Sequence, residues 1–289
     1  MSEQPFDSTQ YKARQRKEWD QVSVGWEKWW GTFERGAQQV SDRLVALAEV
    51  QPGHRVLDVA TGIGEPAVTA ARAVGASGTV TATDQSSGML EIARSRAKTL
   101  GLTNLDFQER DAEQLDFPEQ SFDAVVCRWG LMFLPDLGAA LGRIHRQLVP
   151  GGKFATSVWD APDKVPILGL ALGVIRKMLQ PPPPPPDAPN LFKLAAPGLL
   201  EGAMEKAGFA EVQRESLTVM FEFQTAEEYA AWLKDIAAPV NAILANHPEE
   251  RRAEVWGAIV EAARAFSVPS GGVSIPSQAI CVTGCRGAD

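Results

Sequence analysis

Five short apolar segments alternate with amphipathic segments between Arg55 and Trp159, and this alternation limits the possible folds more than any other feature of the sequence. The apolar segments are rich in β-branched residues, whereas the segments between them have apolar residues at helical spacing or are typical of turns. Strands that alternate with helices in this way form βαβ units around a parallel sheet. The expected strands are Arg55–Ala60, Thr79–Thr83, Asn104–Gln108, Phe122–Arg128 and Lys153–Trp159.

Capping residues mark where the helices between these strands begin. Glu65 and Pro66 are expected to open the first helix, Ser86 or Ser87 to cap the second, and Asp136 to cap a third that ends at a Pro-Gly-Gly turn. Proline fits the first turn of a helix, and serine or aspartate fits the N-cap position. These signals support a doubly wound sheet.

The segment after residue 160 is less regular, with a run of six prolines at Pro181–Pro186 that predicts a stiff, extended connector. The fold class expected for the whole chain is α/β, with a doubly wound, mostly parallel seven-stranded sheet, an N-terminal helical cap and helical insertions. The later helices are expected over Ile167–Leu179, Pro197–Gly208, Ala226–Asn246 and Pro248–Phe266, and the later strands within Glu211–Phe223 and Ser274–Thr283.

Charge and composition exclude several classes of partner. A net charge of -8 and a pI near 5.1 would repel a phosphate backbone, so nucleic acid is not expected as a substrate. The basic residues among Lys12–Lys17 are interpreted as a solvated helical face. Three cysteines, no secretory h-region and no bilayer-length apolar run predict a cytoplasmic protein without membrane insertion. Oligomeric state stays open.

Polar residues gather where the expected strands end. In an open parallel sheet, ligands bind outside the carboxyl ends of the strands, at the point where the winding direction reverses. Those ends carry Asp58–Gly64, Asp84, Asp111 and the pair Arg128 and Trp129. Asp84 follows Gly64 by about 20 residues, the spacing of a carboxylate that accepts both ribose hydroxyls. The ligand is therefore expected to contain a nucleoside.

The turn after the first strand argues against a pyrophosphate. Glu65 adds a negative charge there and Pro66 removes a backbone donor, although a pyrophosphate needs donors and a favourable field. An amino-acid nucleoside with a cationic sulfonium and an α-amino group fits Asp58 and Glu65 better. A Rossmann oxidoreductase is accordingly the least favoured enzyme class.

Four ordered segments carry a resemblance to a known family: VLDVATGIGEPA, TATDQSSGMLEIA, RDAEQLDFPEQSFDAVVCRWGLMFLPD and LVPGGKF. They resemble the successive motifs of class I S-adenosylmethionine-dependent methyltransferases, especially the ubiquinone and menaquinone biosynthesis branch, over residues 40–160. The resemblance implies S-adenosyl-L-methionine as cofactor and S-adenosyl-L-homocysteine as product. It also implies one methyltransferase domain over 1–289, with a helical lid at 1–44, a cofactor-binding core at 45–160, and the remaining strands with substrate-side helices at 161–289.

Transferred residue by residue, the resemblance implies a complete cofactor site. The loop under the methionine part would consist of Asp58, Ala60, Gly62 and Gly64, and Asp84 would bind the ribose. Gln85 and Met89 would flank the adenine, and Asp111 with Ala112 would meet its amino edge. Arg128 and Trp129 would border the sulfonium. Ala60 stands where many members have glycine, and Gln85 where an apolar residue is common. Neither departure is expected to abolish binding.

An aromatic N-terminal segment is the expected lid. Trp26, Trp29 and Trp30 are predicted either to cover the cofactor and face its cation, with Trp30 as the cofactor contact, or to pack the helix onto the core. The substrate side is expected from Trp129, Met132 and Phe133 with the apolar segments around 160–195 and 225–266. A small, hydrophobic or aromatic acceptor molecule follows as a hypothesis.

No residue is predicted to act as general base, and no metal site is expected. His54, His145 and His247 lie away from the expected strand ends, so a structural or solvated role is favoured for each. Cys281 and Cys285, four residues apart on one expected strand, could approach one another but lack further ligands for a metal. The alternatives to a small-molecule methyltransferase are a polyprenyl quinone C-methyltransferase and a cofactor-binding protein without catalysis.

Overall fold

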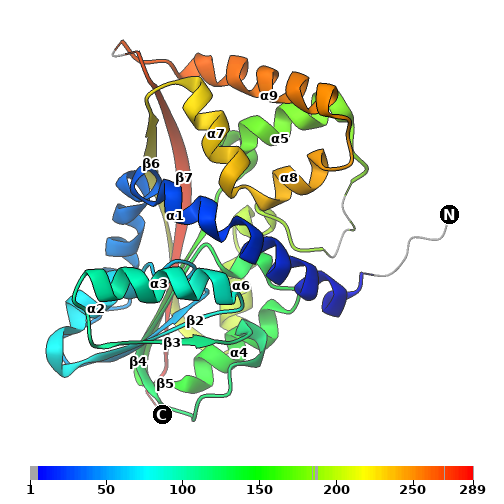
Figure 1. Cartoon of the computed structure of the whole chain (residues 1–289). Coiled ribbons are helices and arrows are strands. Elements are labelled where there is room, and N and C mark those ends of the chain that lie inside the picture. Colours follow the sequence, from blue (N-terminus) through cyan, green and yellow to red (C-terminus); the bar gives the residue numbers. More distant parts are fainter. Residues whose placement is uncertain (1–5, 184, 186–187, 270, 289) are drawn as a thin grey trace.

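A computed structural model of the chain describes residues 6–183, 185, 188–269 and 271–288. Its strands form one sheet in the order β3-β2-β1-β4-β5-β7-β6 (Figure 1). The strands are β1 Arg55–Val59, β2 Thr79–Asp84, β3 Leu105–Glu109, β4 Phe122–Arg128, β5 Leu148–Trp159, β6 Phe209–Phe223 and β7 Val273–Arg286. The helices are α1 Ser8–Leu47, α2 Ala67–Val74, α3 Ser87–Thr99, α4 Leu137–Gln147, α5 Pro166–Leu179, α6 Leu199–Lys206, α7 Ala226–Ile236, α8 Ala238–Leu244 and α9 Glu249–Ala263.

The predicted sheet is confirmed. Strands β1 to β5 run parallel, and β7 pairs antiparallel with both β5 and β6. The order reverses between β1 and β4, because the chain winds outward through β2 and β3 and then returns to the other side of β1. Loops after β1 and β4 therefore diverge at one edge of the sheet, where a doubly wound fold binds its ligand.

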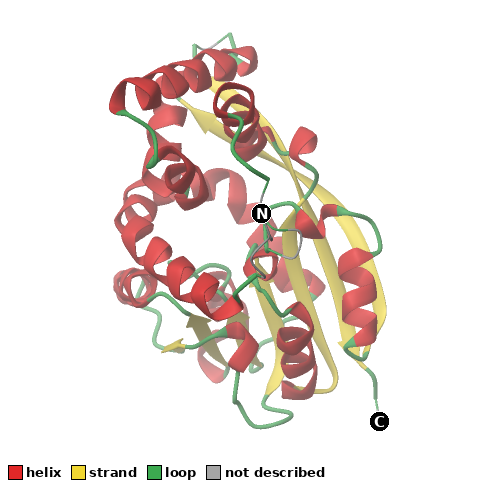
Figure 2. Cartoon of the chain, turned by 90° about the vertical axis from the view of Figure 1, so that its right-hand side faces the viewer, coloured by secondary structure: helices red, strands yellow, loops and turns green. Residues whose placement is uncertain are grey.

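Helices cover both faces of this sheet (Figure 2). On one face α1 packs against α2 and α3, and on the other α4 packs against α6. The buried middle of the sheet is apolar, with Leu57, Val125 and Phe154 fully enclosed. Helices α5, α7, α8 and α9 gather beyond α1, at the far ends of the long strands β6 and β7 (Figure 1). The helix α1 thus lies between the sheet and this second group of helices.

Side-chain caps set several helix starts as the sequence predicts. The Ser86 hydroxyl accepts the Met89 N–H at 3.1 Å, and the Asp136 carboxylate accepts the Ala139 N–H at 2.9 Å. Each bond satisfies a backbone donor that the first turn of a helix leaves free.

Some predicted boundaries are wrong. The single helix expected over Ala226–Asn246 is two helices, α7 and α8, and Pro239 in the first turn of α8 explains the break because proline cannot continue the ladder of α7. The first βα helix begins at Ala67, after a cis Glu65–Pro66 peptide bond, and β5 begins at Leu148. Of the expected proline connector, residues 181–183 and 185 have no regular secondary structure, whereas Pro184 and Pro186 lie outside the described residues.

Cys281 and Cys285 do not approach one another. Both lie on β7, where four residues of extended chain span about 13 Å. Both thiols are free. Among the described residues, no group of histidine, cysteine and carboxylate side chains has the geometry of a metal site. In the same part of the chain, no helix has the length and apolar character needed to cross a bilayer.

Candidate functional site

A pocket lies at the carboxyl edge of the parallel strands and is closed by α1. The space within it that is open to the centre of a water molecule is about 200 Å³. One side, the strand-end wall, consists of residues 60–63, 65, 83–85, 110–112 and 128, together with Met89. The other side, the apolar wall, consists of residues 132–135, Trp159, Ile167, Leu168, Leu172, Leu191, Trp232, Ile236, Ala237, Pro239 and Val240. Trp129 and Gly130 lie in the lining as well, and α1 contributes Lys12, Gln15, Trp19, Trp26, Trp30 and Phe33.

Asp84 organises the strand-end wall. One carboxylate oxygen accepts the Gly62 N–H at 2.8 Å, and the other accepts the Ser86 N–H at 2.9 Å. Gly62 and Gly64 have positive φ angles of 56° and 105°, which glycine adopts without the steric cost of a Cβ atom. Burial raises the pKa of the Asp84 carboxyl. Each oxygen keeps lone-pair capacity for a ligand, so Asp84 can accept two hydroxyl groups from the pocket.

Asp58 supports the same loop from beneath and does not line the pocket. Its side chain is fully buried, and one oxygen accepts the Ala67 N–H at 2.8 Å. The other oxygen has no hydrogen-bond partner among the described residues. Burial raises the pKa of this carboxyl to about 8. The structure therefore gives Asp58 a role in holding the loop at the start of α2.

Asp111 is held by the lid helix. Its carboxylate accepts the Glu113 N–H at 2.9 Å and pairs with Lys12 Nζ at 2.7 Å. Lys12 also pairs with Glu113, and Arg16 pairs with Glu109 at the end of β3. The solvated face expected for these basic residues is therefore wrong for Lys12, whose side chain is only 22% exposed.

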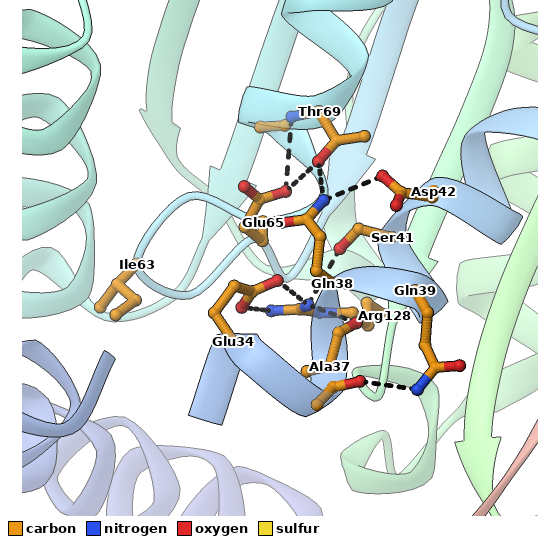
Figure 3. Close-up of polar contacts among 12 residues, drawn as sticks. Glu34, Ala37, Gln38, Gln39, Ser41, Asp42, Ile63, Glu65, Thr69 and Arg128 are labelled. Carbon is orange, nitrogen blue, oxygen red and sulfur yellow. Dashed lines mark hydrogen bonds and ion pairs between the residues drawn. The ribbon is translucent and has the colours of Figure 1, made fainter. Parts of the chain in front are cut away.

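Arg128 anchors the middle of α1 (Figure 3). Its guanidinium forms a two-pronged pair with Glu34, with N–O distances of 2.8 and 3.1 Å, and donates to the Ser41 hydroxyl at 2.9 Å. The exposed fractions of the Arg128 and Glu34 side chains are 6% and 10%. A buried bidentate pair of this kind fixes geometry more strongly than an exposed pair. Arg128, which the sequence analysis placed at the border of the sulfonium, thus directs its charge at Glu34 of the lid helix α1.

Glu65 adds a second buried carboxylate beside this pair. Its residue is 4% exposed, and one oxygen accepts the Thr69 hydroxyl at 2.7 Å. Burial raises the pKa of the Glu65 carboxyl. Among the described residues, hydrogen bonds reach only one of the two Glu65 oxygens. Because Glu65 lines the pocket, its other oxygen can accept a ligand ammonium group.

The lid tryptophans divide into two kinds. Trp26 and Trp30 line the pocket, whereas Trp29 donates its N–H to Asp235 at 2.7 Å and lies outside the lining. The Arg96 guanidinium lies 3.4 Å from the Trp30 ring centroid, and it also donates to the Ile63 carbonyl. One face of Trp30 is therefore covered by a cation of the protein itself.

Most residues that the sequence analysis assigned to the cofactor come together at this pocket. Asp58 and Gly64 lie behind the lining and shape the loop. The lining contains Trp30, Ala60, Gly62, Asp84, Gln85, Met89, Asp111, Ala112, Arg128 and Trp129. The expected substrate side also lines it, from Met132 and Phe133 to parts of α5, α7 and α8. The three histidines lie outside the lining.

Sequence reasoning missed the contribution of α1 beyond its tryptophans. Lys12, Gln15 and Phe33 line the pocket, and Glu34 fixes Arg128. Helical spacing from Trp26 and Trp30 would have placed Phe33 on a neighbouring position of the same face. Lys12 carried no such signal, because its acidic partners lie 99 residues and more along the chain.

The side chains of the strand-end wall fit an amino-acid nucleoside. Asp84 can accept ribose hydroxyls, Met89 and Ile63 offer buried apolar surface for a base, and Glu65 can accept an ammonium group. A pyrophosphate would meet the buried Glu65 carboxylate at the turn before α2. The wall is therefore suited to a cationic ligand such as S-adenosylmethionine.

A family model described as a methyltransferase domain matches residues 56–152. The ubiquinone/menaquinone biosynthesis C-methyltransferase UbiE of Xanthomonas campestris pv. campestris is 43% identical over 111 residues, covering 38% of this chain and 44% of that protein. Aklanonic acid methyltransferase DauC of Streptomyces sp. strain C5 is 36% identical over 150 residues, covering 52% of this chain and 67% of that protein. This chain therefore spans less than half of that UbiE and about two thirds of DauC.

The crystal structure of the YcgJ protein from Bacillus subtilis is similar in fold, with a TM-score of 0.58 and 21% identity. The likeness covers 87% of this chain and 100% of YcgJ. The family match thus coincides with the part of the chain that forms the strand-end wall.

Proposed function

Because the chain belongs to the class I S-adenosylmethionine-dependent methyltransferases, we propose that it moves a methyl group to a small apolar or aromatic molecule bound against the apolar wall. The observation that carries the proposal is the Asp84 carboxylate. It is set by the backbone amide of Gly62 in the family's glycine loop and by that of Ser86 before α3, and it faces a pocket whose opposite side is apolar.

The strand-end wall would hold the cofactor. Asp84 would accept the ribose hydroxyls, Glu65 the ammonium group, and Asp111 the adenine amino edge. When bound, S-adenosylmethionine supplies the methyl group and leaves as S-adenosylhomocysteine. Asp111 would exchange its bond to Lys12 for the adenine, or share its oxygens between the two.

The protein's own contribution is alignment and exclusion of water. Such a transfer consumes charge, so a dry site with fixed geometry favours it. The lid helix α1 is fixed at Lys12, Glu34 and Arg43, and the aromatic side chains between these points close the pocket. We further propose that the lid, the core and the insertions work as one unit, since residues of all three line the cavity.

A polyprenyl quinone C-methyltransferase is the second candidate, favoured by the 43% identity to UbiE over 111 residues and by the match of the methyltransferase domain model to the cofactor-binding segment 56–152. That segment contains the strand-end wall and only part of the apolar wall. The residues of α5, α7 and α8 that line the apolar wall come from outside the 56–152 match. We therefore prefer a small-molecule acceptor that differs from a polyprenyl quinol.

The decisive experiment is a two-part assay of the purified full chain. Calorimetry measures binding of S-adenosylhomocysteine and of NAD, and mass spectrometry measures S-adenosylhomocysteine release with phenols, polyprenyl and short-chain quinols, amines and thiols. We expect S-adenosylhomocysteine to bind with a micromolar dissociation constant. We also expect S-adenosylhomocysteine to be released from S-adenosylmethionine when a phenol or quinol is the acceptor. Binding without release for any acceptor class would favour a non-catalytic protein, and tight NAD binding alone would contradict the proposal.

A further inference from the structure

A lysine of the lid helix contacts the two carboxylates that follow β3. Lys12, in the second turn of α1, lies with Nζ 2.7 Å from an Asp111 carboxylate oxygen, and it also pairs with Glu113. Lys12 and Asp111 both line the pocket, and the Lys12 side chain is mostly buried. Partly buried ion pairs are screened less by salt than exposed ones, so this contact holds its partners in place.

Glu113 ties this contact to the core. Its side chain is 9% exposed, and one of its oxygens accepts the Asp136 N–H, at the start of α4, at 2.7 Å. Arg143 of α4 donates to the Glu113 backbone carbonyl at 2.8 Å. Glu113 is therefore fixed by α4, and a Lys12 ammonium bonded to it has a fixed position relative to Asp111.

Lys12 stays charged in this position. Burial lowers the pKa of its ammonium group, but the hydrogen bonds to Asp111 and Glu113 outweigh burial and raise that pKa above its ordinary value. One cation thus compensates two carboxylates that lie two residues apart. Without it these carboxylates would repel one another, and the repulsion would favour protonation or rotation of Asp111, the more exposed of the two.

Asp111 keeps room for a ligand while Lys12 holds it. One of its oxygens accepts the Glu113 N–H at 2.9 Å, and the other accepts a hydrogen bond from Lys12. Each carboxylate oxygen has two lone pairs, so each can accept one more hydrogen bond from the pocket. A ligand amino group can therefore bind Asp111 without displacing Lys12. A ligand oxygen in the same place would meet another acceptor and stay unpaired, which is costly in a buried site.

We propose that Lys12 is a positioning residue for recognition of the purine base. It keeps the Asp111 carboxylate charged and oriented, so that the site accepts the exocyclic amino group of adenine and rejects a purine with an oxygen in that place. The proposal rests on the proposed function and deepens it, because it makes the lid a part of base selection as well as a cover. Lys12 acts through Asp111, and the cofactor binds with their ion pair intact.

The test compares two ligands that differ in one group: S-adenosylhomocysteine, and S-inosylhomocysteine, in which an oxygen replaces the exocyclic amino group. Calorimetry measures the affinity of each for the full chain and for Lys12→Met, which nearly keeps the length of the side chain but removes its charge. We expect the wild type to prefer the adenine ligand by about tenfold or more, the factor that a hydrogen bond to a charged group contributes. Lys12→Met should lose most of this preference, whereas Lys12→Arg should keep most of it.

Arg16→Met is the matched control, because Arg16 lies about one turn further along α1 and pairs with Glu109 at the end of β3. This substitution removes a charged contact of the lid but leaves the pair of Lys12 with Asp111. We expect Arg16→Met to keep the preference for the adenine ligand, whatever its effect on both affinities. Thermal melting verifies the fold of each variant, and Lys12→Gln takes the place of Lys12→Met if the methionine variant does not fold.

A double-variant comparison shows whether Lys12 acts through Asp111. In an Asp111→Asn background, Lys12→Met should no longer change the preference between the two ligands, and a change there would overturn the proposal. The same holds for a wild type without preference, for equal weakening of both ligands in Lys12→Met, and for loss of the preference in Arg16→Met. Failure of the wild type to bind S-adenosylhomocysteine at all would instead contradict the proposed function.

Discussion

The strand-end wall and the apolar wall enclose the same pocket but are built in different ways. The strand-end wall consists of short loops that each follow a strand, fixed by charged and backbone hydrogen bonds such as those of Asp84. The apolar wall consists of side chains from α5, α7, α8 and the segment before α4, held mainly by packing. The helix α1 touches both walls.

This difference separates what the protein shares with its family from what is its own. Hydrogen bonds to backbone amides require a fixed loop geometry, so few side chains can replace Asp84 or the loop glycines. Packing of apolar groups tolerates many combinations of residues. The residues of the apolar wall can therefore change, and with them the substrate, without disturbing the strand-end wall.

The largest effect is expected where the lid meets the strand-end wall. Glu34→Gln removes the hydrogen-bonded ionic partner of the buried Arg128 guanidinium, leaves only more distant carboxylates such as Glu65 near its charge, and should lower the free energy of unfolding by about 3–5 kcal/mol. Glu215→Gln is the control, because the Arg43–Glu215 pair is 44% and 38% exposed and should contribute less than about 1 kcal/mol. Urea unfolding measures both, and equal losses would contradict the importance of burial.

The second effect concerns the ribose ligand. Asp84→Ala should weaken S-adenosylhomocysteine binding by at least ten- to hundredfold, since hydrogen bonds to a charged group contribute about 1.5–3 kcal/mol each. Asp106→Ala, at an exposed carboxylate on β3, is the control. Because both Asp84 oxygens accept backbone N–H groups, from Gly62 and Ser86, Asp84→Asn loses one of these two bonds. Its affinity should fall between those of the alanine variant and the control, and its melting temperature should lie below that of the wild type. Calorimetry gives the affinities, and an unchanged value for the alanine variant would remove Asp84 from the site.

The third effect is a pH dependence of stability that arises behind the strand-end wall. Burial raises the pKa of Asp58 from 3.8 to about 8, so between these values the folded state binds a proton that the unfolded state has lost. Stability from this group must then fall as the pH rises toward 8 and stay constant above it, by up to about 1.4 kcal/mol per pH unit. Urea unfolding from pH 6 to pH 9 should show the wild type losing stability relative to Asp58→Asn up to pH 8. Parallel curves would contradict this shift.

The strand-end wall and the lid helix α1 differ in how far the sequence predicts their contacts. Asp84 and Asp111 follow strands whose parallel order is a local pattern, so their meeting at one edge follows from the fold alone. The contacts of α1 are different, because Lys12 with Asp111, Glu34 with Arg128 and Trp29 with Asp235 each join distant segments. The spacing of residues within one segment does not indicate which charged residues of distant segments will form pairs. The sequence thus predicts which residues meet in the strand-end wall and which segments form the apolar wall. It does not predict the residue pairs that position the lid.

The fourth effect is confined to the apolar wall. Leu172→Asn places an amide in apolar surroundings and should weaken binding of the apolar probe naphthalene by roughly tenfold, or about 1.4 kcal/mol. Affinity for S-adenosylhomocysteine should stay within about twofold of the wild type. Leu199→Asn, at an exposed leucine away from the pocket, is the control for both ligands. If the substitution weakened cofactor binding as much as probe binding, the two walls would not be independent.

The smallest effect tests the strain at Ala60, where many family members have glycine. Ala60 has a φ of 57°, a left-handed conformation that costs a residue with a Cβ atom about 1–2 kcal/mol. Ala60→Gly relieves that cost but frees the unfolded chain by about 0.4–1 kcal/mol, so the net gain in stability should lie between about 0 and 1.6 kcal/mol. A Cβ atom at Gly130 would lie 2.7 Å from the Ala60 Cβ and 2.8 Å from the Cys127 Sγ. Gly130→Ala should therefore destabilise the protein less in the Ala60→Gly background, although the Cys127 contact remains. Additive effects in urea unfolding would show that Ala60 and Gly130 do not share this space.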